Sequence, residues 1–205
     1  MLFRSGILSS LTSETIAIHF TASNYCHFRN KTVADRYAQL SARKRKAIYP
    51  LSILPMDRET LAVQRTAGII GIGGDFSKKT YESFNPVFMI NNTALPDNHY
   101  KEKSKKFSEG RNNFLFFAGA DNVRKGLDLL LDVFIELDQH LWICSYIDKA
   151  FYALYEKELN NYPNIHLVGH VTPRSKIFFD IINKCNYVIL PSCSEGQPPS
   201  VVEAM

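Results

Sequence analysis

Two glutamates near the carboxyl end of the chain have a type and spacing that suit the binding of a polyhydroxy ligand. Glu195 and Glu203 stand eight positions apart in YVILPSCSEGQPPSVVEAM. A carboxylate can accept both hydrogens of a vicinal diol, such as that of a ribose. The pair therefore predicts contacts with a sugar or a nucleoside. The alternative is that Glu195 complements a helix dipole and Glu203 is solvated.

The segments around these glutamates must place them at one edge of a sheet. Residues 187–190 are apolar and predict a buried strand that stops at Pro191, and helical spacing resumes at Pro199. Ligands of parallel α/β sheets bind beyond the carboxyl ends of the strands. A helix that starts there offers free N–H groups and a positive dipole end, which suit phosphate. The segment thus predicts a site for a ligand with both hydroxyl and phosphate groups.

The preceding residues alternate between strand and helix patterns. Short apolar runs predict strands at residues 114–118, 141–144 and 165–168. Apolar residues at helical spacing predict a helix over 127–134, one from Asp148 as N-cap to Leu159, and one that begins near Pro173. Alternating strands and helices are typical of a parallel sheet covered on both faces, so the fold class is α/β.

The first half of the chain is less regular. Strands are predicted at residues 15–20, 67–72 and 86–90, and a helix at 32–45. No GxGxxG turn opens this half, so a dinucleotide fingerprint is absent. Residues 94–112 hold a proline and several lysines and little apolar content. They are either a solvated surface loop or a linker between two lobes.

Composition excludes several classes of protein. The chain has 205 residues, 45% hydrophobic and 21% charged, which is typical of a globular protein and excludes a disordered tail or a coiled coil. No apolar run reaches the roughly 18 residues of a membrane helix. The four cysteines have neither zinc-ligand spacing nor a dense disulfide pattern, so we expect reduced thiols, no metal and a cytoplasmic location.

Charge and histidines give weaker indications of partners. The net charge of +4 suits a partner with phosphate groups. The basic run RKRK at residues 43–46 could contact nucleic acid or anionic lipid, or be a solvated helix end. Because no aromatic residues interleave it, we expect no nucleic-acid partner, and peripheral membrane contact stays open. His19 and His27 are either catalytic or acceptor-binding histidines, or structural or surface ones.

Three segments of the second half resemble a known family. EGQPPSVVE resembles the E-x7-E motif of retaining GT-B glycosyltransferases, in particular glycosyltransferase family 4 (glycosyl transferases group 1). FLFFAGADNVRKGLDLLLDVFIEL resembles the opening strand, loop and helix of that family's donor lobe, with Lys125 and Gly126 before the helix. NIHLVGHVTPRSKIFFDIINKCNYVILPS resembles the strands and helix that lead to the motif. TAGIIGIGGDFSKKTYESFNPVFMINN resembles the end of the acceptor lobe more loosely.

The resemblance implies a GT-B-like α/β fold with two Rossmann-like lobes, both incomplete in this chain. Residues 1–93 would be the end portion of the amino-terminal, acceptor-side lobe. Residues 94–112 would link the lobes, and residues 113–205 would be a truncated nucleotide-sugar donor lobe. We therefore expect a fragment that by itself transfers no sugar.

The implied activity is transfer of a hexose from a nucleotide-diphosphate sugar to a hydroxyl group with retention of configuration. The acceptor would be a glycan, a lipid-linked molecule or a small molecule. Neither a cofactor nor a metal is implied. The alternative is a truncated, non-catalytic remnant that keeps only a nucleotide-binding or partner-binding surface.

The resemblance also implies roles for the matched residues. Glu195 would contact hydroxyls of the donor sugar, while Glu203 would hold the ribose. Backbone N–H groups of Gly196 and Gln197 would also bind the donor, and Lys125 would neutralise its diphosphate.

One departure from the family's pattern concerns the phosphate contacts. The family usually has an arginine directly after the glycine that ends the opening strand, whereas here Gly119 is followed by Ala120. Arg124, beside Lys125, would have to take over that phosphate contact.

We predict that Lys125→Ala weakens binding of the diphosphate. A hydrogen bond to a charged group is worth roughly 1.5–3 kcal/mol, so the dissociation constant should rise about 10- to 150-fold. Calorimetric titration of a nucleotide diphosphate measures the effect. An unchanged dissociation constant would show that Lys125 does not bind the diphosphate.

Overall fold

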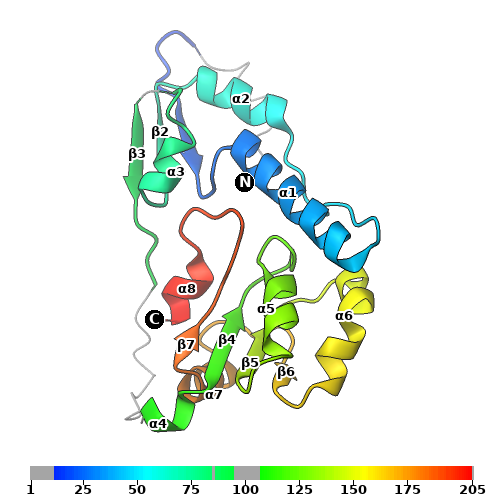
Figure 1. Cartoon of the computed structure of the whole chain (residues 1–205). Coiled ribbons are helices and arrows are strands. Elements are labelled where there is room, and N and C mark those ends of the chain that lie inside the picture. Colours follow the sequence, from blue (N-terminus) through cyan, green and yellow to red (C-terminus); the bar gives the residue numbers. More distant parts are fainter. Residues whose placement is uncertain (1–11, 85, 95–106, 205) are drawn as a thin grey trace. The chain divides into compact units, whose positions relative to one another are not determined.

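The computed structural model describes residues 12–84, 86–94 and 107–204. They form two compact units (Figure 1). Unit 1 comprises Met1–Asn92 and Cys193–Pro198, and unit 2 comprises Thr93–Ser192 and Pro199–Met205. Most of the predicted linker, residues 95–106, lies outside the described residues. Its last part forms the short helix α4 (Phe107–Gly110).

Unit 1 contains a parallel sheet with the strand order β1-β2-β3. The strands are β1 (Ile18–Thr21), β2 (Gly68–Ile72) and β3 (Val87–Ile90), close to the predicted positions. The helices are α1 (Cys26–Lys44), α2 (Met56–Gln64) and α3 (Asp75–Lys79). Helix α1 starts six residues before the predicted start, and the sequence patterns do not predict α2 and α3.

The apolar core of unit 1 lies on one face of this sheet. Ile69 and Val87 point to the same side as Val63 of α2 and Tyr81, and these four side chains are buried together. Because side chains alternate along a strand, the neighbouring residues point to the opposite face. On that face Ile18, Phe20, Phe88 and Ile90 are at least 47% exposed, while Ile70 and Ile72 of β2 are partly buried.

Unit 2 contains a second parallel sheet with the strand order β6-β5-β4-β7. The four predicted strands are confirmed as β4 (Asn113–Phe117), β5 (His140–Cys144), β6 (Ile165–Leu167) and β7 (Tyr187–Val188). The helices are α5 (Leu127–Phe134), α6 (Lys149–Asn161), α7 (Lys176–Lys184) and α8 (Pro199–Ala204).

Capping residues fix where two of these helices begin. The Asp148 carboxylate accepts a hydrogen bond from the Phe151 N–H at 2.8 Å, which confirms the predicted N-cap of α6. Helix α7 begins later than predicted, because the Ser175 hydroxyl caps it by accepting from the Phe178 N–H at 3.2 Å.

Helices cover both faces of the sheet in unit 2. On one face, Leu115 and Phe117 of β4 pack with Phe178 and Ile181 of α7. On the other face, the Phe114 ring meets Phe134 of α5 at a centroid distance of 5.3 Å.

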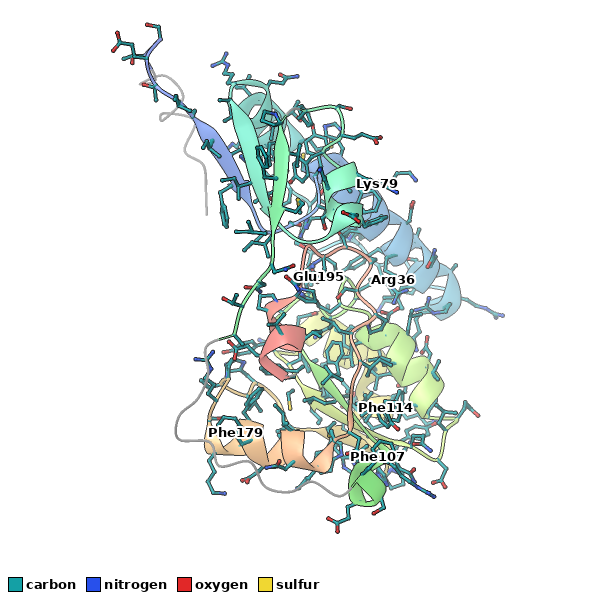
Figure 2. The ribbon with its side chains drawn as sticks, turned by 90° about the vertical axis from the view of Figure 1, so that its left-hand side faces the viewer. Arg36, Lys79, Phe107, Phe114, Phe179 and Glu195 are labelled. Atoms are coloured by element: carbon teal, nitrogen blue, oxygen red, sulfur yellow. The ribbon has the colours of Figure 1, made fainter. Side chains whose placement is uncertain are left out.

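Aromatic contacts join β4, β7 and α4. Tyr187 of β7 stacks on Phe114 at 4.8 Å and meets Phe107 of α4 edge-on at 6.1 Å. Phe114 and Phe107 are labelled in Figure 2. The β7 edge of the sheet is therefore held by ring packing in addition to the backbone hydrogen bonds between β4 and β7.

The strand order places a topological switch point between β4 and β7. From β4 the chain adds β5 and then β6 on one side, and it returns to add β7 on the other side of β4. In open parallel sheets, ligands bind beyond the carboxyl ends of the strands at the point where the order reverses. The two loops that leave this point are residues 118–126 after β4 and the segment after β7 that includes Pro191.

These two loops touch each other at Gly126. Its φ is +85°, and a Cβ on this residue would overlap the backbone carbonyl of Pro191. Glycine is the residue that tolerates both the left-handed conformation and such a close approach. The turn that carries Lys125 is thereby pressed against the chain that leaves β7.

We predict that Gly126→Ala lowers the free energy of unfolding by about 2–4 kcal/mol, from backbone strain together with the overlap with Pro191. Gly119→Ala is the matched control, because Gly119 is exposed and a Cβ added to it would meet nothing within 4 Å. Urea unfolding of both variants measures the difference. Equal stabilities would contradict the proposed close contact.

Candidate functional site

The turn after β4 carries three of the predicted site residues: Gly119, Arg124 and Lys125. The Arg124 guanidinium donates to the Asp121 carboxylate at 2.8 Å, and only 16% of its side chain is exposed. The Lys125 N–H donates to the Asp121 carbonyl at 3.0 Å. Arg124, expected to bind phosphate, is thus engaged by a carboxylate within its own turn.

Asn122 ties this turn to the loop after β5. Its side chain is fully buried. The amide nitrogen donates to the Ser145 hydroxyl at 3.1 Å and the Tyr146 carbonyl at 2.9 Å, while the amide oxygen accepts from the Asp148 N–H at 3.2 Å. The Ser145 hydroxyl also donates to the Gly119 carbonyl at 2.7 Å. These bonds join the carboxyl ends of β4 and β5 into one edge.

An aromatic pair lies on the loops that leave β5 and β6. The rings of Tyr146 and His170 stack at a centroid distance of 4.0 Å and an interplanar angle of 11°. Sequence reasoning missed this pair, as it missed Asn122 and Ser145. Their position directly after buried strands was the only available signal.

Glu203 forms an ion pair with Arg174 in unit 2. The guanidinium donates to both carboxylate oxygens, with distances of 2.9, 3.1 and 3.2 Å. The two side chains are 22% and 29% exposed. Arg174 adopts a left-handed conformation with φ +62°. Sequence reasoning did not indicate Arg174, because its partner lies 29 positions away.

The loop Cys193–Pro198, which contains Glu195, Gly196 and Gln197, belongs to unit 1. Glu195 is labelled in Figure 2. A Cβ on Gly196 would collide with the Ile72 and Ala22 carbonyls, at the carboxyl ends of β2 and β1. The loop therefore lies directly against that edge of the unit 1 sheet.

Polar side chains of unit 1 hold this loop. Asn24 donates to the buried Ser194 hydroxyl at 3.2 Å, and the Ser77 hydroxyl donates to the Glu195 carbonyl at 3.4 Å. The Asn92 N–H donates to the side-chain oxygen of Gln197. The predicted site residues are thus divided between the units, with 195–197 in unit 1 and Gly119, Arg124, Lys125 and Glu203 in unit 2.

His19 lies in a buried polar network of unit 1. Its Nε2 is 3.5 Å from the Glu59 carboxylate, which also accepts from the Tyr81 hydroxyl at 2.8 Å and the Cys26 N–H at 3.0 Å. Burial alone would raise the pKa of Glu59, but hydrogen bonds, that of His19 first, lower it below its usual value. The arrangement supports a structural role for His19.

The neighbouring Cys26 and His27 differ in exposure. Burial, reinforced by Glu59, raises the pKa of the Cys26 thiol to about 12, so this thiol stays protonated at neutral pH. His27 is exposed, stacks on Tyr25 at 5.1 Å and contacts the Thr60 hydroxyl at 3.3 Å.

Neither a metal cluster nor a disulfide occurs among the described residues. Within ranges 12–84, 86–94 and 107–204, no three His, Cys, Asp or Glu side chains gather so that they could hold a metal ion. All four cysteines fall in these ranges, and each is a free thiol.

Comparison with known proteins shows a family similarity over most of unit 2. Residues 111–205 match the family described as "Glycosyl transferases group 1". Most of unit 2 is therefore similar to a glycosyltransferase domain. This confirms the predicted resemblance at the level of that family.

A relative and a solved structure extend the comparison. The "Uncharacterized glycosyltransferase MJ1178" of Methanocaldococcus jannaschii is 30% identical over 118 residues, which are 57% of this chain and 32% of that protein. The crystal structure of TarM matches with a TM-score of 0.62 at 15% identity, over 97% of this chain and 36% of that chain. The likeness to TarM confirms the GT-B-like α/β fold class with Rossmann-like lobes. The chain spans about a third of the length of these two proteins.

We predict that Arg174 and Glu203 are energetically coupled. In a double-mutant cycle with Arg174→Gln and Glu203→Gln, the coupling free energy should be about 1–2 kcal/mol, because the pair is bidentate and mostly shielded from water. The control cycle uses Lys176 and Asp180, which pair at 2.7 Å while 89% and 45% exposed, and its coupling should stay below about 0.5 kcal/mol. Equal coupling in both cycles would mean that Arg174 does not constrain Glu203.

Proposed function

We propose that the chain is part of a cytoplasmic glycosyltransferase that moves a sugar from a nucleotide-diphosphate sugar to a hydroxyl acceptor with retention of configuration. Unit 2 would bind the nucleotide diphosphate. The observation that carries this proposal is the switch point between β4 and β7, where the Lys125 turn packs on Pro191 within the segment similar to group 1 glycosyltransferases. Ligands of this sheet type bind at such a point.

In this proposal Lys125 acts on the leaving group. Breaking the bond between the sugar and the diphosphate places negative charge on the diphosphate, and a fixed cation stabilises that charge in the transition state. Asn122 supports this role, because its buried hydrogen bonds fix the turn to the neighbouring loop. We assign no metal and no cofactor to the reaction.

Glu203 would hold the ribose, with Arg174 as a positioning residue. The guanidinium fixes the orientation of the carboxylate, because it donates to both of its oxygens. A carboxylate has about four lone-pair sites, so it can accept from ribose hydroxyls while it remains bound to Arg174. Glu195, with the backbone of Gly196 and Gln197, would contact the sugar.

A second candidate is a nucleotide-binding protein without transferase activity. Two observations favour it: Ala120 stands where the resembled family has an arginine, and Arg124 is bound to Asp121. With Arg124 engaged by Asp121 and no arginine at position 120, the nucleotide would bind but the leaving group would be stabilised less.

A thermal-shift panel of nucleotide diphosphates and nucleotide sugars tests the shared part of both candidates. A ligand at about 100 times its dissociation constant stabilises the folded protein by about 2.7 kcal/mol, which is readily measured. Stabilisation by the diphosphates is expected. No shift with any member of the panel would reject both candidates. An assay for a glycosylated acceptor separates the two candidates, because only the transferase would form this product. NMR of the product then shows whether the configuration is retained.

We predict that the two glutamates affect different ligands. Glu203→Gln should raise the dissociation constants of the donor and of the free nucleotide diphosphate by a similar factor of roughly 10 to 150, because both ligands carry the ribose. Glu195→Gln should weaken binding of the donor and leave binding of the nucleotide diphosphate unchanged, because the diphosphate lacks the transferred sugar.

Calorimetric titration of both ligands against both variants measures these effects. Glu156→Gln, on the exposed surface of α6, is the matched control and should change neither affinity. Equal losses for both ligands in Glu195→Gln, or no loss in Glu203→Gln, would show the assignment to be wrong.

A further inference from the structure

The positive charge of the chain is concentrated in one short segment of unit 1. Residues 43–58 contain Arg43, Lys44, Arg45, Lys46 and Arg58 against the single acid Asp57, a net charge of +4. The whole chain has 24 basic and 20 acidic residues, also +4, so the remaining residues are balanced. The segment covers the end of α1, the loop to α2 and the start of α2.

Polar side chains of α1 hold the loop in this segment, mainly through hydrogen bonds to the backbone of the loop. It runs back beside α1 toward α2 (Figure 1). Arg29, which is buried, donates to the Ser52 carbonyl and hydroxyl at 3.2 Å. Asn30, also buried, donates to the Leu54 carbonyl at 2.8 Å and accepts from its N–H at 2.9 Å. Ser41 makes the corresponding two bonds with Ile48.

This anchoring leaves the alternate side chains in solvent. Ile48, Pro50, Ser52 and Leu54 are partly buried, whereas the side chains that alternate with them are exposed. The exposed fractions are 79% for Tyr49, 59% for Leu51 and 51% for Ile53. Isolated exposed apolar side chains are common, but a fixed row of them beside a cationic run is typical of an interaction surface.

We propose that this surface, residues 43–58, docks on an anionic lipid bilayer. The three apolar side chains would enter the boundary between headgroups and acyl chains, and the cations would face the lipid phosphates. A single partner would then contact both the cationic and the apolar side chains of the surface. A nucleic acid would satisfy the cations but leave Leu51 and Ile53 without an apolar partner.

Among the residues that the structure describes, no helix combines the length and the apolar content that crossing a bilayer requires. The proposed contact is interfacial and reversible, and it does not depend on the proposed function.

Flotation with lipid vesicles tests the proposal on the 205-residue chain. We expect binding to vesicles of phosphatidylcholine with phosphatidylglycerol as the minor lipid, and much weaker binding to pure phosphatidylcholine. Binding should fall in 1 M salt, where the Debye length is only about 3 Å. Equal binding to both vesicle types, or binding to neither, would overturn the proposal.

Paired variants separate the two halves of the surface. Arg45→Gln with Lys46→Gln should weaken binding about 25-fold, or about fivefold for each cation near an anionic surface. Lys149→Gln with Lys157→Gln is the matched control, because it removes the same charge from exposed positions of α6. Equal losses of vesicle binding in both double variants would mean that only the net charge of the chain matters, and would reject the proposed docking surface.

Leu51→Ser with Ile53→Ser tests the apolar half. It should weaken binding to anionic vesicles while the unfolding transition stays unchanged, because both side chains are exposed. Undiminished vesicle binding in this variant would overturn the proposal. The proposal would also be overturned if the chain bound duplex DNA more tightly than vesicles and the Arg45 and Lys46 substitutions abolished that binding. The surface would then be assigned to nucleic acid.

Discussion

The close approach of Gly126 to the Pro191 carbonyl is the constraint on which the candidate site of unit 2 depends. It requires a residue without a Cβ in a left-handed conformation at the start of α5. The contact presses the turn after β4 against the chain that leaves β7. Because these strands are neighbours at the switch point, the contact also decides where Lys125 lies relative to the segment that continues toward Glu203.

Around this contact, neutral and charged residues have separate tasks. Asn122 and Ser145 are buried and join the loops after β4 and β5 through hydrogen bonds between uncharged groups, which provide rigidity without a buried charge. Arg174 and Asp121 each engage an oppositely charged side chain, so their charges are largely compensated. Both also adopt left-handed conformations, with φ of +62° and +73°. Such strain persists where the surrounding structure fixes a turn.

Unit 1 combines a buried polar network with an uneven surface. Glu59 organises the end of β1 by accepting from Tyr81 and from the first N–H of α1, and its lowered pKa keeps it charged in that role at neutral pH. Ser77 and Asn24 hold the loop that carries Glu195 at the same end of the sheet. Residues 43–46 of the cationic surface lie at the carboxyl end of α1, and the rest of that surface runs back beside α1 as far as Arg29 and Asn30.

Local patterns in the sequence were sufficient for the strands and most helices of unit 2, because apolar periodicity and an N-cap such as Asp148 act within a few residues. Helix α2 was missed because only Ala62 and Val63 are buried, which is too few for a visible period. The early start of α1 was missed because Arg29 and Asn30 are polar, and they are buried only through bonds to the loop more than 20 positions away. The motif glutamates, Lys125 and Gly126 could be found by type and spacing. Their partners could not, because Arg174 meets Glu203 across 29 positions and Pro191 meets Gly126 only once the strand order brings β7 beside β4.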